Sequence, residues 1–294
     1  MTDSTDKNQK VIFLDLDGTI YSLMGVIPES TKEAIHRAQS IGHMVFLNTG
    51  RNRGEIPEDV LKLNFDGLIT SGGASVEIKG KRIYNETIPG TVLKKVYDYL
   101  ISKDIIFTVE DNLNIYGNEE QIRYQKEIYM RNGEKTLEQY KRQAGEGLYD
   151  FSCGIDIFIQ GLTTVENIYK VKNINKVMFH KSKITIEEMK AEIGGFISII
   201  GKDGAGNYSD GEMYHKDINK ATGMEVILNY YGLRRSSTIA FGDNLNDLEM
   251  ISYAGIGVAM GNAVDLLKST ADLITRENDK DGLYYGFEQC KLLI

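Results

Sequence analysis

The stretch VIFLDLDGT, residues 11–19, is the part of the sequence that decides the fold. An unbroken apolar run precedes two acids, Asp15 and Asp17, and then Gly18. A run that is apolar on both faces is typical of a strand buried in a parallel sheet. Because side chains alternate along a strand, Asp15 and Asp17 are expected on one side of the chain. Neighbouring carboxylates need a cation or a shared proton, and Mg²⁺ prefers such oxygen ligands; the alternative is an ordinary Asp-Gly turn.

The same pattern of an apolar run followed by small polar residues returns further along the chain. It occurs in HMVFLNTGR (residues 43–51), STIAFGDN (residues 237–244) and GIGVAMGN (residues 255–262). A helix is predicted between the first two runs, and a capping box of Ser30 and Glu33 is expected at its start. Strands that alternate with helices predict an α/β fold with a doubly wound parallel sheet. The polar clusters would then meet at the carboxyl ends of the strands.

The middle of the chain, residues 86–214, has a different pattern. Its apolar residues alternate or pair as hairpins, and IIFTVED and NLNIYG flank a predicted tight turn at Asp111 and Asn112. GIDIFIQ, residues 154–160, is predicted as a further strand. Helices are expected over residues 91–103, 119–132 and 186–193. This mixture predicts an inserted α+β domain, within a core formed by residues 1–85 and 215–294.

Thr49, Gly50 and Arg51 close the second apolar run. A hydroxyl and backbone N–H groups at a strand end are suited to holding a phosphate. The alternative is an ordinary loop, since a Thr before a Gly is common in loops.

Lys220 is expected in or just before the first turn of a helix in DINKATGMEVILNYYG. A cation there opposes the helix dipole, at a cost of about 0.3–1 kcal/mol. The placement is easier to understand if Lys220 faces an anion, and the alternative is a solvated surface lysine. Replacing Lys220 by Ala is therefore expected to impair phosphate turnover and to destabilise the protein little.

GDNLNDLEM, residues 242–250, places several oxygen-bearing side chains close together after an apolar run. Two of them are the acids Asp243 and Asp247, and two are the amides Asn244 and Asn246. Helix capping by Asp and Asn is the alternative explanation. Two acids and two amides exceed what capping requires, so the stretch is predicted to be functional.

Composition excludes several classes of function. The chain has 294 residues with 34 Lys+Arg against 42 Asp+Glu, a formal net charge of −8, which argues against nucleic-acid binding. Its only cysteines, Cys153 and Cys290, provide neither a disulfide framework nor a zinc site. The polar start MTDSTDKNQK lacks a secretory core, and no apolar run approaches the ~20 residues of a membrane span. A cytoplasmic protein is expected, and the sequence leaves its oligomeric state open.

These motifs, in this order, resemble those of the haloacid dehalogenase-like (HAD) superfamily. DLDGT, the Thr49-Gly50-Arg51 segment, Lys220 and GDNLND follow one another as the superfamily's motifs do, and GVAMGNA with the later ADLIT resembles its Cof-type sugar-phosphatase branch. The resemblance implies a Rossmann-like core with a large cap domain inserted where residues 86–214 lie. One departure is Gly72 in ITSGGA, which stands where the branch often has Asn. An inference of substrate from the branch is weakened by this difference.

The resemblance also implies catalytic and metal-binding roles. Asp15 would attack phosphorus and form an aspartyl-phosphate, and Asp17 would protonate the leaving group and later activate water. Mg²⁺ would bind the backbone carbonyl of Asp17 and the carboxylates of Asp15 and Asp243, supported by Asp247. The phosphoryl oxygens would be held by Thr49, Gly50, Lys220 and Asn246.

The sequence therefore predicts a Mg²⁺-dependent phosphatase that acts on a small phosphorylated metabolite, such as a sugar phosphate. A large cap would admit small substrates better than protein-bound phosphates. A phosphomutase, which returns the phosphoryl group to a sugar, is the nearest alternative. A non-enzymatic receiver-like module is another, although such modules are about half as long and lack a second acid placed as Asp17 is.

Overall fold

The computed structural model describes residues 9–21, 26–144, 157–204 and 208–294. The chain forms two compact units. The first unit comprises Met1–Gly50, Glu58–Tyr84 and Asn219–Ile294, and the second comprises Arg51–Pro57 and Asn85–Ile218. The division expected from the sequence lay at residues 85/86 and 214/215, and it left residues 51–57 in the core.

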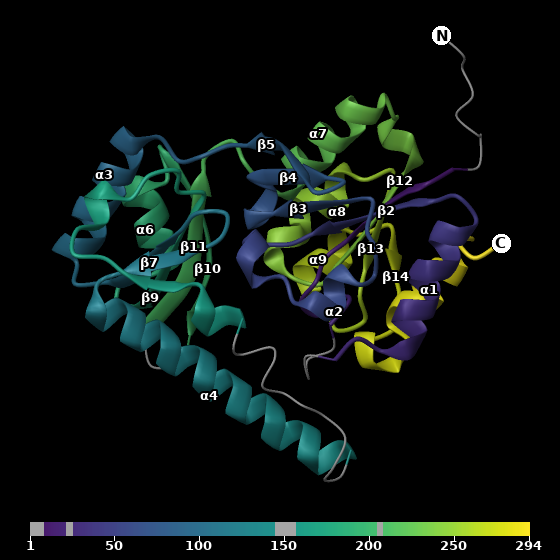
Figure 1. Ribbon diagram of the computed structural model, residues 1–294, viewed down its shortest axis with the longest axis horizontal. Coiled ribbons are helices and arrows are strands. Elements are labelled where there is room, and N and C mark those ends of the chain that lie inside the picture. The colour runs from purple at the N-terminus through teal and green to yellow at the C-terminus, as the bar shows by residue number, and fades with distance from the viewer. Residues whose placement is uncertain (1–8, 22–25, 145–156, 205–207) are drawn as a thin grey trace. The chain divides into compact units, whose positions relative to one another are not determined.

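The first unit is built on an eight-stranded sheet with the order β14-β13-β12-β1-β2-β3-β4-β5. The strands from β14 to β3 run parallel, and β4 pairs antiparallel with β3 (Figure 1). This arrangement confirms the predicted α/β fold. The strands are β1 (Val11–Leu14), β2 (Met44–Asn48), β3 (Gly67–Thr70), β4 (Ser75–Ile78), β5 (Lys81–Asn85), β12 (Thr238–Gly242), β13 (Ile256–Ala259) and β14 (Leu273–Ile274).

Helices cover both faces of this sheet. On one face Val11 and Phe13 of β1 share a buried core with Met224 of α7 and Met250 of α8. On the other face the ring of Phe241 in β12 packs against Phe287 of α10, 5.2 Å between centroids, and α10 lies beside α1. The helices are α1 (Glu29–Ser40), α2 (Glu58–Leu61), α7 (Lys220–Tyr231), α8 (Leu248–Tyr253), α9 (Asp265–Thr270) and α10 (Gly282–Gln289), with short 3-10 turns η2 (Ser71–Gly73), η4 (Arg235–Ser237), η5 (Leu245–Asp247) and η6 (Asn278–Lys280).

The predicted capping box at the start of α1 is wrong. The helix begins at Glu29, with Pro28 in the capping position and no side-chain cap. Proline suits a helix start because its φ is fixed near the helical value and a donor there would have no partner in the helix. The Ser30 hydroxyl instead donates to Asp281 Oδ1 over 2.6 Å. A contact with a residue distant in sequence has replaced the local one.

The second unit has its own sheet with the order β10-β11-β9-β6-β7-β8. The predicted hairpin is present: β6 and β7 pair antiparallel, and the backbone N–H groups of Leu113 and Asn114 donate to Asp111 Oδ1 in the turn. The strands are β6 (Ile106–Glu110), β7 (Ile115–Gly117), β8 (Leu162–Thr164), β9 (Lys176–Ser182), β10 (Ile197–Gly204) and β11 (Tyr208–His215).

The helices of the second unit lie on opposite faces of its sheet (Figure 1). Buried residues of α3 and α6 share one core with Phe107 and Phe179. On the other face Gln125 of α4 is hydrogen-bonded to His180 of β9. The helices are α3 (Gly90–Ser102), α4 (Glu119–Ala144) and α6 (Ile186–Ile193), with turns η1 (Arg53–Glu55) and η3 (Ile168–Lys170).

The strand predicted over residues 154–160 is wrong where the structure describes it. Residues 157–160 are helical, and residues 154–156 lie outside the described part. The Phe158 ring stacks on the Tyr129 ring of α4, 4.8 Å between centroids. Packing of this ring against a helix outweighed the strand-like apolar pattern.

Candidate active site

Several of the predicted residues follow strands of the parallel sheet. Asp15 follows β1, Thr49 follows β2 and Asp243 follows β12. The backbone N–H of Asp15 donates to the Phe241 carbonyl over 3.0 Å, which continues the pairing of β1 with β12. Since parallel strands all point the same way, these residues lie along one edge of the sheet.

Lys220 joins two acids in a buried ion triad. Its Nζ lies 2.5 Å from Asp15 Oδ1 and 2.6 Å from Asp247 Oδ1. Lys220 is 1% exposed, Asp15 5% and Asp247 0%, so the charges are shielded from water. A triad buried in this way holds its atoms firmly, because a charge left without its partner there would be costly. The alternative of a solvated surface lysine is excluded.

Two neighbouring elements fix the start of α7, where Lys220 lies. The Asn219 side chain caps the helix and accepts hydrogen bonds from the backbone N–H groups of Ala221 and Thr222, at 2.9 and 3.2 Å. Asn48, the last residue of β2, donates from Nδ2 to the Lys220 carbonyl over 3.1 Å. Asn48 is not among the predicted site residues, although it lies directly before Thr49 at the same strand end.

The loop after β12 is folded around the carboxylate of Asp247. Its Oδ2 accepts hydrogen bonds from the backbone N–H groups of Asp243 and Asn244, at 2.9 and 3.0 Å. A Cβ on Gly242 would lie 2.6 Å from the Asp247 carboxyl carbon, so this close approach requires glycine. Capping is thus part of what this loop does, because Asn244 also forms a capping box with Asp247.

Asp243 presents an unpaired oxygen within the cluster. Its Oδ1 is buried and has no hydrogen-bond partner among the described residues. Its Oδ2 lies 3.4 Å from Asn262 Nδ2, which also donates to the Gly18 carbonyl over 2.9 Å. Asn262 belongs to the GNA stretch after β13, so its place at the end of a strand was the available signal for this residue.

The acids of the cluster outnumber the positive charges beside them. Ligand atoms of Asp15, Asp243 and Asp247 all lie within 4.8 Å of one another. Burial raises the pKa of Asp15 well above its ordinary value, opposed by Lys220 and reinforced by Asp247 and Asp243. Burial and the negative charge of Asp247 raise the pKa of Asp243 to about 7. Burial alone would lower the pKa of Lys220, but attraction by Asp15 and Asp247 raises it above its ordinary value. One lysine therefore does not neutralise the three acids.

The other predicted residues lie in the segments that follow β1, β2 and β12. Asp17 is exposed, and its negative charge raises the pKa values of both Asp15 and Asp243. Thr49 is buried; its N–H donates to the Ile69 carbonyl, and its carbonyl accepts from the Gly72 N–H. Gly50 is the last residue before the chain passes from the first unit into the second. The Asn246 side chain is half-buried in η5. Phosphate binding by Thr49, Gly50 and Asn246 stays a prediction.

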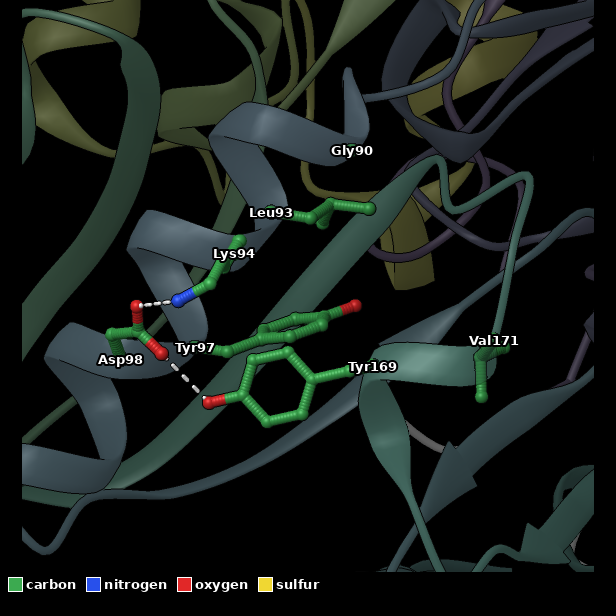
Figure 2. Close-up of a pocket in the computed structure, with 7 residues that line it drawn as sticks. All are labelled: Gly90, Leu93, Lys94, Tyr97, Asp98, Tyr169 and Val171. Atoms are coloured by element: carbon green, nitrogen blue, oxygen red, sulfur yellow. Dashed lines mark hydrogen bonds and ion pairs between the residues drawn. The ribbon is translucent and has the colours of Figure 1, made fainter.

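A hollow of about 570 Å³ occurs in the second unit (Figure 2). Tyr97 and Tyr169 line it, and Asp98 accepts hydrogen bonds from Lys94 and Tyr169 along its rim. Lys94 and Asp98 are exposed, so their ion pair contributes little to stability. None of the residues that line the hollow is among the predicted site residues, so the hollow does not change the assignment.

Comparison with known proteins gives a family model that matches most of the chain. The family model of haloacid dehalogenase-like hydrolases matches residues 12–287. Among the helices that the structure describes, none has the length and apolar composition needed to cross a membrane.

Individual relatives are similar over nearly their whole length. The chain is 27% identical over 290 residues to the 5-amino-6-(5-phospho-D-ribitylamino)uracil phosphatase YitU of Bacillus subtilis, covering 93% of this chain and 94% of that protein. It is 28% identical over 297 residues to a phosphatase of the same description, YwtE, from the same organism, covering 95% and 97%. Among solved structures, a sugar phosphatase of HAD subclass IIB superimposes with a TM-score of 0.74 at 26% identity, covering 97% of this chain and 100% of that one.

Proposed function

The chain belongs to the haloacid dehalogenase-like hydrolase family, and from this premise we propose that it is a Mg²⁺-dependent phosphatase of small phosphorylated metabolites, such as sugar phosphates. The observation that carries the proposal is the buried contact of Lys220 with Asp15 and Asp247, beside the unpaired oxygen of Asp243. A buried acid next to a lysine suits attack on a phosphoryl group, whose negative oxygens need positive charge close by.

A magnesium ion fits the donor set. Mg²⁺ is a hard cation that takes oxygen ligands and uses few carboxylates. Asp243 Oδ1 is a buried acceptor without a partner among the described residues, and burial together with the neighbouring carboxylates raises the pKa values of Asp15 and Asp243. Both oxygens of Asp247 already accept hydrogen bonds. We therefore assign Asp15 and Asp243 as direct ligands, with Asp247 supporting them. The family resemblance adds the Asp17 backbone carbonyl as a third direct ligand.

The chain's own residues would carry out the reaction in two steps. In the first, an Asp15 oxygen attacks phosphorus, so that an O–P bond forms while the bond to the leaving oxygen breaks. Asp17, which is exposed, gives its proton to that leaving oxygen. In the second step Asp17 takes a proton from a water molecule whose oxygen attacks phosphorus. The bond between phosphorus and the Asp15 oxygen breaks, which releases inorganic phosphate and restores the Asp15 carboxylate. When bound, the magnesium ion supplies positive charge that offsets the charge of the phosphoryl oxygens.

Lys220 would have a double role in this scheme. Its ammonium group favours the charged form of the Asp15 carboxylate and orients it before substrate binds, through the 2.5 Å contact. The same charge then attracts the phosphoryl oxygens. Thr49, Gly50 and Asn246 would hold these oxygens with a hydroxyl, backbone N–H groups and an amide. Similarity to a sugar phosphatase and to phosphatases of a phosphoribityl compound supports a small polyhydroxylated substrate.

The test is phosphate release by the purified full chain. We expect turnover of para-nitrophenyl phosphate in Mg²⁺ that EDTA abolishes, and loss of at least ~10²-fold in Asp15→Asn. Asp104→Asn is the matched control, because Asp104 is exposed and its left-handed backbone suits Asn. No turnover by the wild type, or an active Asp15→Asn variant, would overturn the proposal. Recovery of an isomerised sugar phosphate in place of free phosphate would point to a phosphomutase.

A further inference from the structure

The segment Arg51–Pro57 directly follows Thr49 and Gly50, yet it belongs to the second unit. The chain leaves the first unit at Gly50 and returns to it at Glu58. Partners that bind this segment lie within the second unit: Glu110, Asn112, Tyr129 and Phe158. The second unit therefore binds the chain directly after Thr49 and Gly50, the two residues that we propose to bind phosphate.

The backbone of the segment is bound to the turn between β6 and β7. The N–H groups of Arg53 and Gly54 both donate to the Asn112 carbonyl, at 2.9 and 3.3 Å. A Cβ on Gly54 would lie 2.2 Å from the Leu113 carbonyl oxygen. Only glycine allows so close an approach, so the segment lies directly against the turn.

Asn52 ties the segment to the sheet of the second unit. It is 0% exposed, and its Nδ2 donates to Glu110 Oε2 over 3.2 Å. Its Oδ1 accepts from the Glu55 N–H at 3.2 Å, while Glu55 Oε2 accepts from the Asn52 N–H at 3.1 Å. Glu110 is itself held by Lys176, 3.0 Å away, and both are buried. A buried network with this many partners favours a single geometry.

Two aromatic residues complete the attachment. The Tyr129 hydroxyl of α4 donates to Glu55 Oε1 over 3.2 Å. The Arg51 guanidinium lies over the Phe158 ring, 4.6 Å from its centroid, and donates to the Glu55 carbonyl over 3.2 Å. The second unit thus binds the segment from its first residue, Arg51, onward.

We propose that Asn52 and Glu110 are positioning residues for Thr49 and Gly50, so that the second unit sets the backbone position of the phosphate-binding loop. This inference rests on the proposed function. Only Gly50 separates Thr49 from Arg51, and adjacent Cα atoms are fixed about 3.8 Å apart. A shift of Arg51 is therefore passed to Thr49 unless Gly50 absorbs it. Within the first unit, the Thr49 backbone is hydrogen-bonded to Ile69 and Gly72.

The test uses variants that weaken the attachment of the segment to the second unit. The first of them keeps the cap of η1 and loses only the contact of Asn52 with Glu110. Asn52→Ser keeps an oxygen that can cap η1 but is too short to reach Glu110. Tyr129→Phe loses only the hydroxyl contact with Glu55 and serves as a milder second variant. Tyr169→Phe is the matched control: it removes a hydroxyl that donates to a carboxylate, Asp98, in the second unit, away from the segment and from Glu110.

The first measurement is amide hydrogen exchange in the full chain. We expect faster exchange at Arg53 and Gly54 in Asn52→Ser and Tyr129→Phe, because their bonds to Asn112 open more often. The second measurement is kinetic. The KM and the inhibition constant of inorganic phosphate should rise about tenfold in Asn52→Ser, with a smaller rise in Tyr129→Phe and a small change in kcat. Tyr169→Phe should match the wild type in both measurements.

A purely structural role of Asn52 would lower kcat and thermal stability and leave phosphate inhibition unchanged. Faster exchange at Arg53 and Gly54 with unchanged phosphate inhibition overturns the inference and leaves the proposed function standing. Unchanged exchange in Asn52→Ser and Tyr129→Phe also overturns it. Absence of turnover in the wild type overturns the proposed function, and the inference with it.

Discussion

At the residue scale, Gly18 has no room for a side chain. Its φ is +87°, and a Cβ would lie 2.2 Å from Asp243 Oδ2. Gly80 has a similar φ of +73° but nothing within 4 Å of the same position. Alanine at either position costs about 1–2 kcal/mol of backbone strain. We expect only Gly18→Ala to displace Asp243 and to raise the Mg²⁺ concentration for half-maximal turnover at least ~10-fold.

Titrating Mg²⁺ in a phosphate-release assay, with Gly80→Ala as the control, checks this expectation. Equal effects of the two substitutions would mean that Gly18 matters only for its backbone conformation.

The raised pKa values of Asp15 and Asp243 predict how stability depends on pH. In the folded protein without Mg²⁺, Asp243 keeps its proton up to a pKa of about 7, whereas an unfolded Asp loses it near 3.8. Between these values the folded state binds more protons, so its free energy of unfolding falls as pH rises. Added Mg²⁺ should reduce this fall, because it favours the charged carboxylates.

Urea unfolding at a series of pH values, with EDTA or with Mg²⁺, measures this dependence. Asp243→Asn should make the curve less steep in EDTA, since an amide does not titrate while Asp15 still does. A free energy of unfolding that rises with pH across this window would contradict the prediction.

Lys220→Ala has a second expected effect besides loss of turnover. The sequence predicts little destabilisation, because a lysine at the start of a helix opposes the helix dipole. In the structure Lys220 is 1% exposed and contacts two buried acids, so its removal leaves them unpaired. We expect a loss of about 3–5 kcal/mol in the free energy of unfolding at neutral pH without Mg²⁺.

Lys62→Ala is the matched control, because its ion pair with Glu58 is exposed and should contribute at most about 1 kcal/mol. Similar losses in both variants would show that the triad of Lys220 does not stabilise the fold.

At the element scale, the start of α7 links helix capping to the site. Asn219 caps the helix whose first residue is Lys220, and Thr185 caps α6 in the second unit in the same way. Replacing either residue by Ala should cost about 1 kcal/mol. Only Asn219→Ala should also lower kcat/KM, because only that cap positions a residue of the acidic cluster.

Unfolding curves and phosphate-release kinetics of the two variants check this prediction, and Asn219→Ser should restore much of the loss. Equal kcat/KM values for Asn219→Ala and Thr185→Ala would show that the start of α7 needs no cap to place Lys220.

At the scale of the whole molecule, each unit has its own buried core. One core contains Phe13, Phe46 and Met224 of the first unit, and another contains Tyr97, Phe107 and Phe179 of the second. The proposed Mg²⁺ ligands all lie in the first unit. Because a ligand stabilises the part that binds it, Mg²⁺ should raise the unfolding temperature of the first unit more than that of the second.

Differential scanning calorimetry with Mg²⁺ or EDTA separates the two transitions, and Asp243→Asn should remove the shift. A single two-state transition, or an equal shift of both transitions, would show that the units unfold together.

The sequence by itself determined the type of fold and the strands that carry the acidic cluster. Apolar runs such as residues 11–14, each followed by polar residues, reveal a buried parallel strand and its end. This information lies in neighbouring residues, because alternation and burial of a central strand act over a few positions. The hairpin at Asp111 was predictable for the same reason, since the Asp111 side chain bonds residues only two and three positions away.

Only the tertiary structure decided what these residues do to one another. Asp15 and Lys220 are 205 positions apart, and Gly18 and Asn262 are 244 apart, yet both pairs are in contact. Lys220 becomes the centre of an ion triad because folding buries it between two acids. The attachment of residues 51–57 to the second unit likewise depends on elements that come together only when the chain folds. Local sequence indicated that Lys220 faces an anion but did not identify its partners, because burial and charge pairing depend on all the neighbours at once.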